Sequence, residues 1–303
     1  MDTHSSSQKN KASSGNLLWR ILVTVLGSIF LFCIITYLVT PFFMVHPNKD
    51  ADAAAALEGF PGLSQINIPC RNELSGYLLD DPSSERLLIF FYGIDDDAAS
   101  SMLYFLENAD AYAGLDIVAI DWPSYGDSKG YCSADSMRAA ACDVVNTFNG
   151  EGASAVSGYS CSEIIIMGYS LGTGPAIYAA SVCGCSDLIL ISPYYSSVDL
   201  YNNVIPIFYG PLNSLAGFRM DSFAYAQDVS ISPLIIASET DARVPYESTL
   251  KLSECFPSGY SLVSFTGIEH GDLPEDAQVL AAIESVTLVQ QTSPTLKSSV
   301  DSW

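Results

Sequence analysis

The feature that most constrains the fold is a serine that stands between an apolar run and a helix-forming segment. Glu163–Tyr169 reads EIIIMGY, which is typical of a strand buried on both faces of a parallel sheet. Ser170 follows directly, flanked two residues away by Gly168 and Gly172, and a helix is expected over Leu171–Val182. Strand and helix backbones approach closely in a nucleophile elbow, so residues at those two positions must be small. The stretch predicts such an elbow, with an ordinary strand-to-helix turn as the alternative.

Seven further short runs predict strands, and the later ones alternate with helical segments. The first two strands follow each other directly, which predicts an antiparallel hairpin at one edge of a mostly parallel, doubly wound eight-stranded α/β sheet. The eight expected strands are Ser64–Pro69, Leu74–Leu79, Arg86–Tyr92, Leu115–Asp121, Glu163–Tyr169, Asp187–Ser192, Pro233–Ser238 and Tyr260–Thr266. Besides the helix after the serine, we expect helices over Ala98–Ala113, Ala134–Phe148, Glu247–Cys255 and Pro274–Val289.

A long uncharged run precedes this pattern. Ile21–Val45 contains no charged residue, and its 25 residues exceed the roughly 20 that are needed to cross a bilayer core. Lys9, Lys11 and Arg20 precede the run, so we expect a single-pass signal anchor in the cell membrane, with a cytoplasmic N-terminus and an extracytoplasmic catalytic domain. A signal peptide cleaved after the run is the alternative, although its apolar region is normally shorter.

These patterns divide the chain into five expected parts, one of which carries an insertion. Residues 195–230 break the strand–helix rhythm with many aromatic residues, and we expect them to cover the site as a lid. The expected parts are a disordered cytoplasmic tail (1–16), the anchor (17–45), a linker (46–62), the catalytic domain (63–293) and a C-terminal tail (294–303).

A serine nucleophile needs a base, and the chain has three histidines. His4 lies in the expected tail and His46 at the membrane boundary. His270 lies in the globular part, on a loop after the last expected strand, so we assign it as the base. The imidazole in turn needs a carboxylate. Asp241 follows the strand Pro233–Ser238 and is preferred as the acid, with Glu239 and Asp272 as competitors.

The oxyanion of a tetrahedral intermediate needs two backbone donors. We expect the amide of Leu171, directly after the nucleophile, and the amide of Ile94, which follows Gly93 at the end of the strand Arg86–Tyr92. Asp95–Asp97 come next and resemble a metal site, but their position favours capping of the following helix. We expect no metal and no cofactor.

Net charge and cysteine content limit the binding partners and the disulfides that we expect. The formal net charge of −22 disfavours nucleic acid and anionic membrane surfaces as partners of the globular domain. Seven of the eight cysteines would face an oxidising compartment under the expected topology. Cys161 precedes one strand and Cys183 and Cys185 precede the next, so we expect a disulfide there, with buried thiols as the alternative. The sequence does not indicate an oligomeric state.

Five motifs in order carry a resemblance to a known family. They are LLIFFYG, VAIDWPSYGDSKG, GYSLGTGPA, PLIIASETDARVP and EHGDL, within residues 64–290. The chain resembles the α/β-hydrolase superfamily, in its membrane-anchored monoacylglycerol-lipase-like and serine-aminopeptidase-like branches. The resemblance implies Ser170 as nucleophile, His270 as base and Asp241 as acid. The chain departs from the family at Tyr92-Gly93-Ile94, where relatives usually carry His-Gly-Asn.

The function expected is an esterase- or lipase-like serine hydrolase that cleaves a carboxylic ester or thioester through an acyl-enzyme. Aromatic residues of the lid favour a small-molecule or lipid-like acyl substrate. The alternatives are an aminopeptidase-like amide hydrolase, which needs an acidic pocket for the substrate amine, and a catalytically silent domain with the same fold that serves binding.

Overall fold

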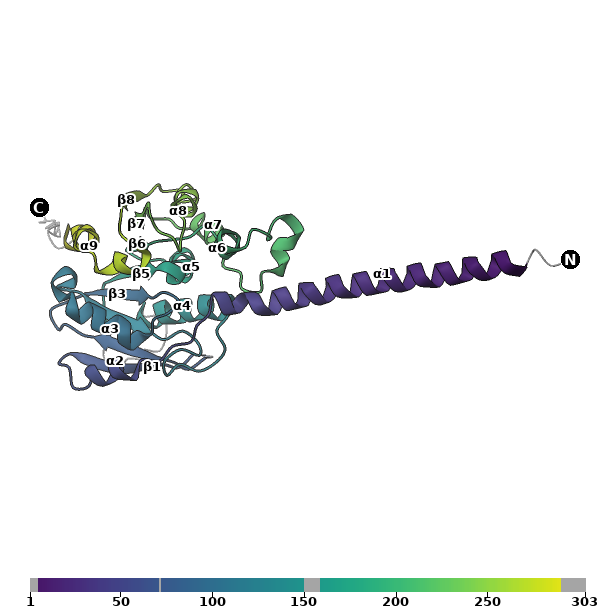
Figure 1. Cartoon of the computed structure of the whole chain (residues 1–303). Helices are drawn as coiled ribbons and strands as arrows, with labels where there is room; N and C mark the ends of the chain where they lie inside the picture. Colours follow the sequence, from purple (N-terminus) through teal and green to yellow (C-terminus); the bar gives the residue numbers. More distant parts are fainter. Residues whose placement is uncertain (1–4, 71, 150–158, 290–303) are drawn as a thin grey trace, which may run out of the picture.

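The computed structural model describes residues 5–70, 72–149 and 159–289, and these form a mixed eight-stranded sheet with helices around it and one long N-terminal helix (Figure 1). The sheet confirms the α/β class and the doubly wound architecture expected from the sequence. Its strands are β1 (Leu63–Ile68), β2 (Leu74–Leu79), β3 (Arg86–Phe91), β4 (Asp116–Ile120), β5 (Glu163–Tyr169), β6 (Asp187–Ile191), β7 (Leu234–Ser238) and β8 (Ser261–Phe265).

The strand order is β1-β2-β4-β3-β5-β6-β7-β8. β1 pairs antiparallel with β2, and β2 antiparallel with β4, while every later pairing is parallel. The expected edge hairpin is therefore confirmed. Because β5, β7 and β8 run parallel, their C-terminal ends meet at one edge of the sheet, which is where parallel sheets carry their sites.

Helices pack on the sheet in two groups. α4 contacts α5, α5 contacts α7 and α7 contacts α8, whereas α3 and α9 both contact the short helix η2. The helices are α3 (Ala98–Glu107), α4 (Ala134–Phe148), α5 (Thr173–Cys183), α6 (Ser197–Val204), α7 (Ser222–Ala226), α8 (Tyr246–Ser253) and α9 (Ala277–Val289), with 3-10 turns η2 (Ala109–Tyr112), η3 (Ser170–Gly172), η4 (Gly210–Leu215) and η5 (His270–Glu275).

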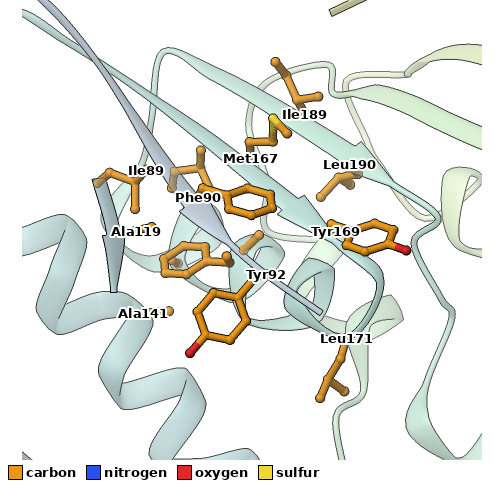
Figure 2. Packing of buried hydrophobic residues seen from close by; sticks show 14 of the residues in the cluster. Ile89, Phe90, Tyr92, Ala119, Ala141, Met167, Tyr169, Leu171, Ile189 and Leu190 are labelled. Atoms are coloured by element: carbon orange, nitrogen blue, oxygen red, sulfur yellow. The ribbon is translucent and has the colours of Figure 1, made fainter. Parts of the chain in front are cut away.

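The core lies in the middle of the sheet. Every residue of β3, β4 and β7 is buried, as expected of strands covered on both faces. Ile89, Met167 and Ile189 contribute side chains from three neighbouring strands, and Tyr169 and Leu171 continue the packing at the end of β5 (Figure 2). This packing holds the end of β5 rigidly.

Strand bounds agree with the sequence expectation within one residue, and the helix bounds differ more. The helix expected over Ala98–Ala113 ends at Glu107 and continues as η2, and the helix expected from Leu171 begins at Thr173 because η3 occupies the turn. The last helix begins at Ala277 rather than Pro274, since Pro274 lies inside η5.

The N-terminal region is helix α1 (Ser5–Val39), followed by η1 (Thr40–Phe43). One stretch, Asn16–Phe43, is long and apolar enough to cross a membrane. α1 begins at Ser5, inside the segment that we expected to be a disordered tail; residues 1–4 and the tail 294–303 lie outside the described residues.

The segment 46–62, expected as a linker, contains a short helix. The alanine run forms α2 (Ala51–Ala56), capped by the side chain of Asp50, which accepts from the amides of Asp52 and Ala53. The backbone amide of Asp50 donates a 2.5 Å hydrogen bond to Asp97, and Lys49 pairs with Asp127. Residues 46–50 are therefore bound to the domain.

The disulfide expected among Cys161, Cys183 and Cys185 is absent from the described part of the chain. The three residues do lie together, around a cavity of about 270 Å³ at the beginnings of β5 and β6. Cys161 Sγ points to the carbonyl of Phe148 instead, to which it donates a 3.7 Å hydrogen bond.

Candidate active site

Ser170 lies in a sharp turn between β5 and α5, with a backbone φ of +51°. This left-handed conformation is strained for a serine and is typical of functional sites. A Cβ at Gly168 would lie 2.8 Å from Thr173 Cα, and one at Gly172 would lie 2.0 Å from the carbonyl oxygen of Phe91. The two glycines therefore occupy positions that no larger residue fits, as the elbow requires.

The structure brings His270 to Ser170. His270 begins η5, just beyond β8, and its Nε2 lies 2.8 Å from Ser170 Oγ. Its Nδ1 lies 2.7 Å from Asp241 Oδ2. A carboxylate only accepts hydrogen bonds, so Nδ1 donates to Asp241 and the neutral ring accepts the serine proton at Nε2. All three side chains are buried.

Asp241 is the carboxylate that the geometry selects over its competitors. Its Oδ1 accepts from the amides of Arg243 (2.8 Å) and Val244 (2.9 Å), and its Oδ2 accepts from the hydroxyl of Ser192 (2.7 Å). Burial alone would raise the pKa of Asp241, but the hydrogen bond and charge of His270, with the bonds from Ser192 and Val244, lower it. The group is thus held as a carboxylate beside the imidazole.

The hydrogen bonds of Glu239 go to β8 and to the residue just beyond it. Its side chain is exposed and accepts from the hydroxyls of Ser264 (3.4 Å) and Thr266 (3.1 Å). Both ring nitrogens of His270 are engaged, by Asp241 and by Ser170, and neither contacts Asp272.

Two positioning residues were not found by sequence reasoning. Tyr169, the variable residue before the serine, stacks on His270 with ring centroids 5.3 Å apart and donates a 2.8 Å hydrogen bond to its carbonyl. Ser192 sits at the end of β6 with φ +49°, which places its hydroxyl on Asp241. The only sequence signal for either residue is its place at the end of a parallel strand.

The expected oxyanion residues lie beside Ser170. A Cβ at Gly93 would be 3.4 Å from Ser170 Cβ, so the loop after β3 passes close to the serine. Ile94 and Leu171 line the same cavity as Ser170. Their carbonyls are engaged elsewhere, that of Ile94 by the Tyr125 hydroxyl at 3.1 Å and that of Leu171 by the Tyr194 hydroxyl at 3.2 Å. These bonds fix the two peptide units next to the serine.

Tyr92, where relatives usually carry histidine, has a structural position in this chain. It is fully buried, and its hydroxyl accepts a 2.9 Å hydrogen bond from the amide of Trp122 and lies 3.4 Å from Asp121. The departure at this position therefore alters packing below the loop and leaves the loop backbone beside Ser170.

The three aspartates after Ile94 have separate roles. Asp97 caps α3 by accepting from the amide of Ser100 at 2.8 Å, as expected from the sequence. Asp95 pairs with His46 and with Arg243, each at 3.0 Å. Burial, followed by the charges of Asp95 and Asp97, raises the pKa of Asp96. No group of three metal-ligating side chains occurs among the residues that the structure describes.

Ser170 lines two cavities, of which the second is the more apolar. One, of about 380 Å³, is lined by the carboxyl groups of Asp95, Asp96 and Glu275 and by Arg243. The other, of about 420 Å³, has walls from η1, the segment 195–230 and the loop after β7. His46 lines this second cavity, a position that its place at the expected membrane boundary did not indicate. Chemistry at Ser170 can thus serve a molecule with one polar and one apolar end.

Comparison with known proteins establishes the fold. Est1E from Butyrivibrio proteoclasticus, in a structure with bound ferulic acid, superposes with a TM-score of 0.59 at 18% identity, covering 75% of this chain and 100% of that one. The esterase Pf2001 from Pyrococcus furiosus superposes with a TM-score of 0.60 at 16% identity, covering 82% and 98%. The chain has the α/β-hydrolase fold.

A curated relative of this α/β-hydrolase chain is Protein ABHD12B from Homo sapiens, which is 27% identical over 193 residues. The match covers 57% of this chain and 51% of that protein, so the chain matches about half the length of its relative. No family model matches the sequence. Ser170, Asp241 and His270 follow the C-terminal ends of β5, β7 and β8. The α/β-hydrolase fold carries its triad in the same chain order.

Proposed function

We propose that the protein is a membrane-anchored serine hydrolase that cleaves a carboxylic ester or thioester. One observation carries the proposal: His270 contacts Ser170 Oγ at 2.8 Å and Asp241 at 2.7 Å in a buried site at a strained elbow. Fold neighbours named as an esterase and as hydrolases support a hydrolase. The apolar cavity beside the serine supports an acyl substrate.

The reaction follows from this geometry in two halves. Ser170 Oγ attacks the acyl carbon while His270 Nε2 takes its proton, and the amides of Leu171 and Ile94 stabilise the oxyanion. The intermediate collapses, His270 returns the proton to the leaving alcohol or thiol, and the acyl group stays on Ser170. Water, deprotonated by His270, then attacks the acyl-enzyme, and collapse releases the acid and restores the serine. Asp241 stabilises the imidazolium in both halves.

A fluorophosphonate probe tests the nucleophile directly. We expect the full chain to be labelled, Ser170→Ala to remain unlabelled, and a change of a hydroxyl far from the site, Ser258→Ala, to label like the wild type. Absence of wild-type labelling, or equal labelling of Ser170→Ala, would favour a silent binding domain instead.

An amide hydrolase with aminopeptidase-like specificity is the second candidate. Asp96 and Glu275 line one cavity at Ser170, together with the paired Asp95 and Arg243, and offer carboxyl groups to a substrate amine. Parallel rates on p-nitrophenyl esters of graded chain length and on aminoacyl amides separate the two candidates. Higher kcat/KM on the amides, lost in Asp96→Asn, would replace the esterase proposal.

The location proposed is the cell membrane, with a cytoplasmic N-terminus and an extracytoplasmic domain. The span Asn16–Phe43 and the basic residues before it support this orientation. Protease added to sealed cells should digest the domain and leave the N-terminal tail intact, and the converse pattern would reverse the topology.

A further inference from the structure

The walls of the apolar cavity come partly from the membrane segment itself. Phe43 and Met44 at the end of this segment face the same cavity as Ser170, and Val204 and Ile205 of the segment 195–230 line it too. Phe43, Val204 and Ile205 are also exposed, with 51%, 71% and 44% of their surfaces accessible. The cavity therefore reaches the molecular surface between the membrane helix and this segment, which we call the lid insertion.

The lid insertion is bonded to the end of the membrane helix. Thr40 Oγ1 accepts a 2.7 Å hydrogen bond from the amide of Gly217, and its carbonyl accepts one of 2.9 Å from the hydroxyl of Tyr201. A Cβ at Gly217 would lie 2.1 Å from the carbonyl oxygen of Tyr37, so the two backbones are in close contact. In Figure 1 the green part of the lid insertion lies beside the end of α1 that joins the domain.

This part of the lid insertion has a composition unlike the rest of the chain. Residues 200–218 contain no charged residue, in a protein with 34 acidic residues and a net charge of −22. Several large apolar side chains of this stretch are exposed, and they are Val204, Ile205, Ile207, Tyr209 and Leu212. Exposed large apolar side chains grouped this closely in the chain are typical of an interaction site.

The length of the membrane segment places this surface at the bilayer. Asn16–Phe43 contains 28 residues, roughly 42 Å of helix, whereas the hydrocarbon core is about 30 Å thick. If the helix crosses the core, its last turns extend into the headgroup region. Those are the turns that contact the lid insertion through Tyr37 and Thr40.

We propose that the uncharged surface of the lid insertion lies in the membrane interface beside α1, and that the apolar cavity opens there to admit the acyl chain of a bilayer-resident ester. This proposal specifies the substrate class of the proposed hydrolase, and it therefore rests on that function. The acyl chain enters between Phe43 and Val204, and its ester group reaches Ser170 at the inner end of the cavity. The polar leaving group then faces the cavity that Asp96 and Glu275 line.

Charged variants of the lid insertion test this route. Tyr209 and Leu212 are exposed and are absent from the cavity lining, so Tyr209→Glu/Leu212→Glu should leave the catalytic groups intact. The full chain in lipid nanodiscs would be assayed on water-soluble p-nitrophenyl butyrate and on a long-chain ester dissolved in the same bilayer. We expect the double variant to lose roughly tenfold or more on the bilayer ester and to match the wild type on the soluble ester.

The matched control is Val182→Glu, a charge placed on a residue that is 61% exposed at the end of α5, the end farther from the elbow. It should leave both rates unchanged. Equal loss in the control, or wild-type rates of the double variant on the bilayer ester, would overturn the proposal. Failure of the wild type on the soluble ester and with the fluorophosphonate probe would instead overturn the hydrolase function.

Contact with lipid can be measured without any hydrolysis. Photoreactive benzoylphenylalanine at the Tyr209 position, in the full chain reconstituted in liposomes, should cross-link to phospholipid. The same group at the Val182 position should not. A cross-link between two copies of the chain would identify the surface as a dimer interface. The absence of any cross-link would indicate that the surface faces water. Either result would overturn the proposal.

Discussion

Ser192 donates a 2.7 Å hydrogen bond to Oδ2 of Asp241, the same oxygen that His270 contacts. Ser192→Ala removes this bond while keeping the Cβ and the positive φ of the residue. The pKa of Asp241 should rise, because this bond is one of those that lower it. We expect kcat/KM to fall about tenfold, with the acidic limb of its pH profile moved to higher pH.

The relevant measurement is kcat/KM across the pH range for a soluble ester. A uniform loss at every pH would mean that the hydroxyl acts through packing alone. Ser238→Ala offers a comparison on the neighbouring strand, since that hydroxyl bonds the carbonyl of Ile268 (2.6 Å) in the histidine loop rather than the carboxylate.

The choice between two nearby carboxylates gives a second prediction. Asp241→Asn should lower kcat by roughly 10³–10⁴ because the amide stabilises neither the required tautomer nor the imidazolium. Glu239→Gln should change kcat less than twofold, because Glu239 is exposed and contacts Ser264 and Thr266. A severe loss in Glu239→Gln with an active Asp241→Asn would exchange the roles of the two residues.

A buried carboxyl near the loop after β3 makes stability depend on pH. Burial raises the pKa of Asp121 to about 6, although the amides of Ala98 and Asp127 donate to it. Because the folded pKa exceeds the ordinary value, the folded state binds the proton more tightly than the unfolded state. The stabilising contribution is complete below about pH 4 and is lost as the pH rises through about 6.

Asp121→Asn should remove this dependence. The difference in unfolding free energy between wild type and variant should therefore change by on the order of 2 kcal/mol between about pH 4 and 7. Denaturant unfolding of both proteins in the same detergent at several pH values measures it. A difference that stays constant with pH would show that Asp121 does not titrate in this range.

The hydroxyl of Thr40 gives a prediction about local stability. Thr40→Val keeps the shape of the side chain but removes the acceptor of the Gly217 amide. The backbone of residues 205–218 should exchange its amide hydrogens roughly tenfold faster, measured by mass spectrometry. Thr249→Val is the control, since its hydroxyl bonds the carbonyl of Pro193 (2.7 Å) and its loss should not affect this peptide.

The sequence predicted the sheet well because its strands are nearly continuous apolar runs with clear limits. It also predicted Ser170, Asp241 and His270 as neighbours, because each follows a strand whose C-terminal end meets the others at one edge. Tyr169 and Ser192 were missed because their contribution depends on φ angles and ring stacking, which leave no pattern in the sequence.

The contacts that His46 and the end of α1 make with the domain were missed for a different reason. Contacts between His46 and Asp95, or Thr40 and Gly217, join residues far apart in the chain, and local periodicity carries no information about them. The alanine run in 46–62 was interpreted as a linker from its position. Its helix is stabilised by the Asp50 cap and by packing of α2 on α3.

The binding of residues 46–50 to the domain has a kinetic consequence. The amide of His46 donates to the Tyr125 hydroxyl at 2.8 Å, the carbonyl of Asn48 accepts from Gly126, and Lys49 pairs with Asp127. In a chain anchored by α1 as proposed, these contacts leave no free tether, so the domain could not swing toward a neighbouring membrane. The proposed hydrolase would then work in cis: its turnover should follow the mole fraction of substrate within its own bilayer, and dilution of the surrounding suspension should leave the rate per enzyme unchanged.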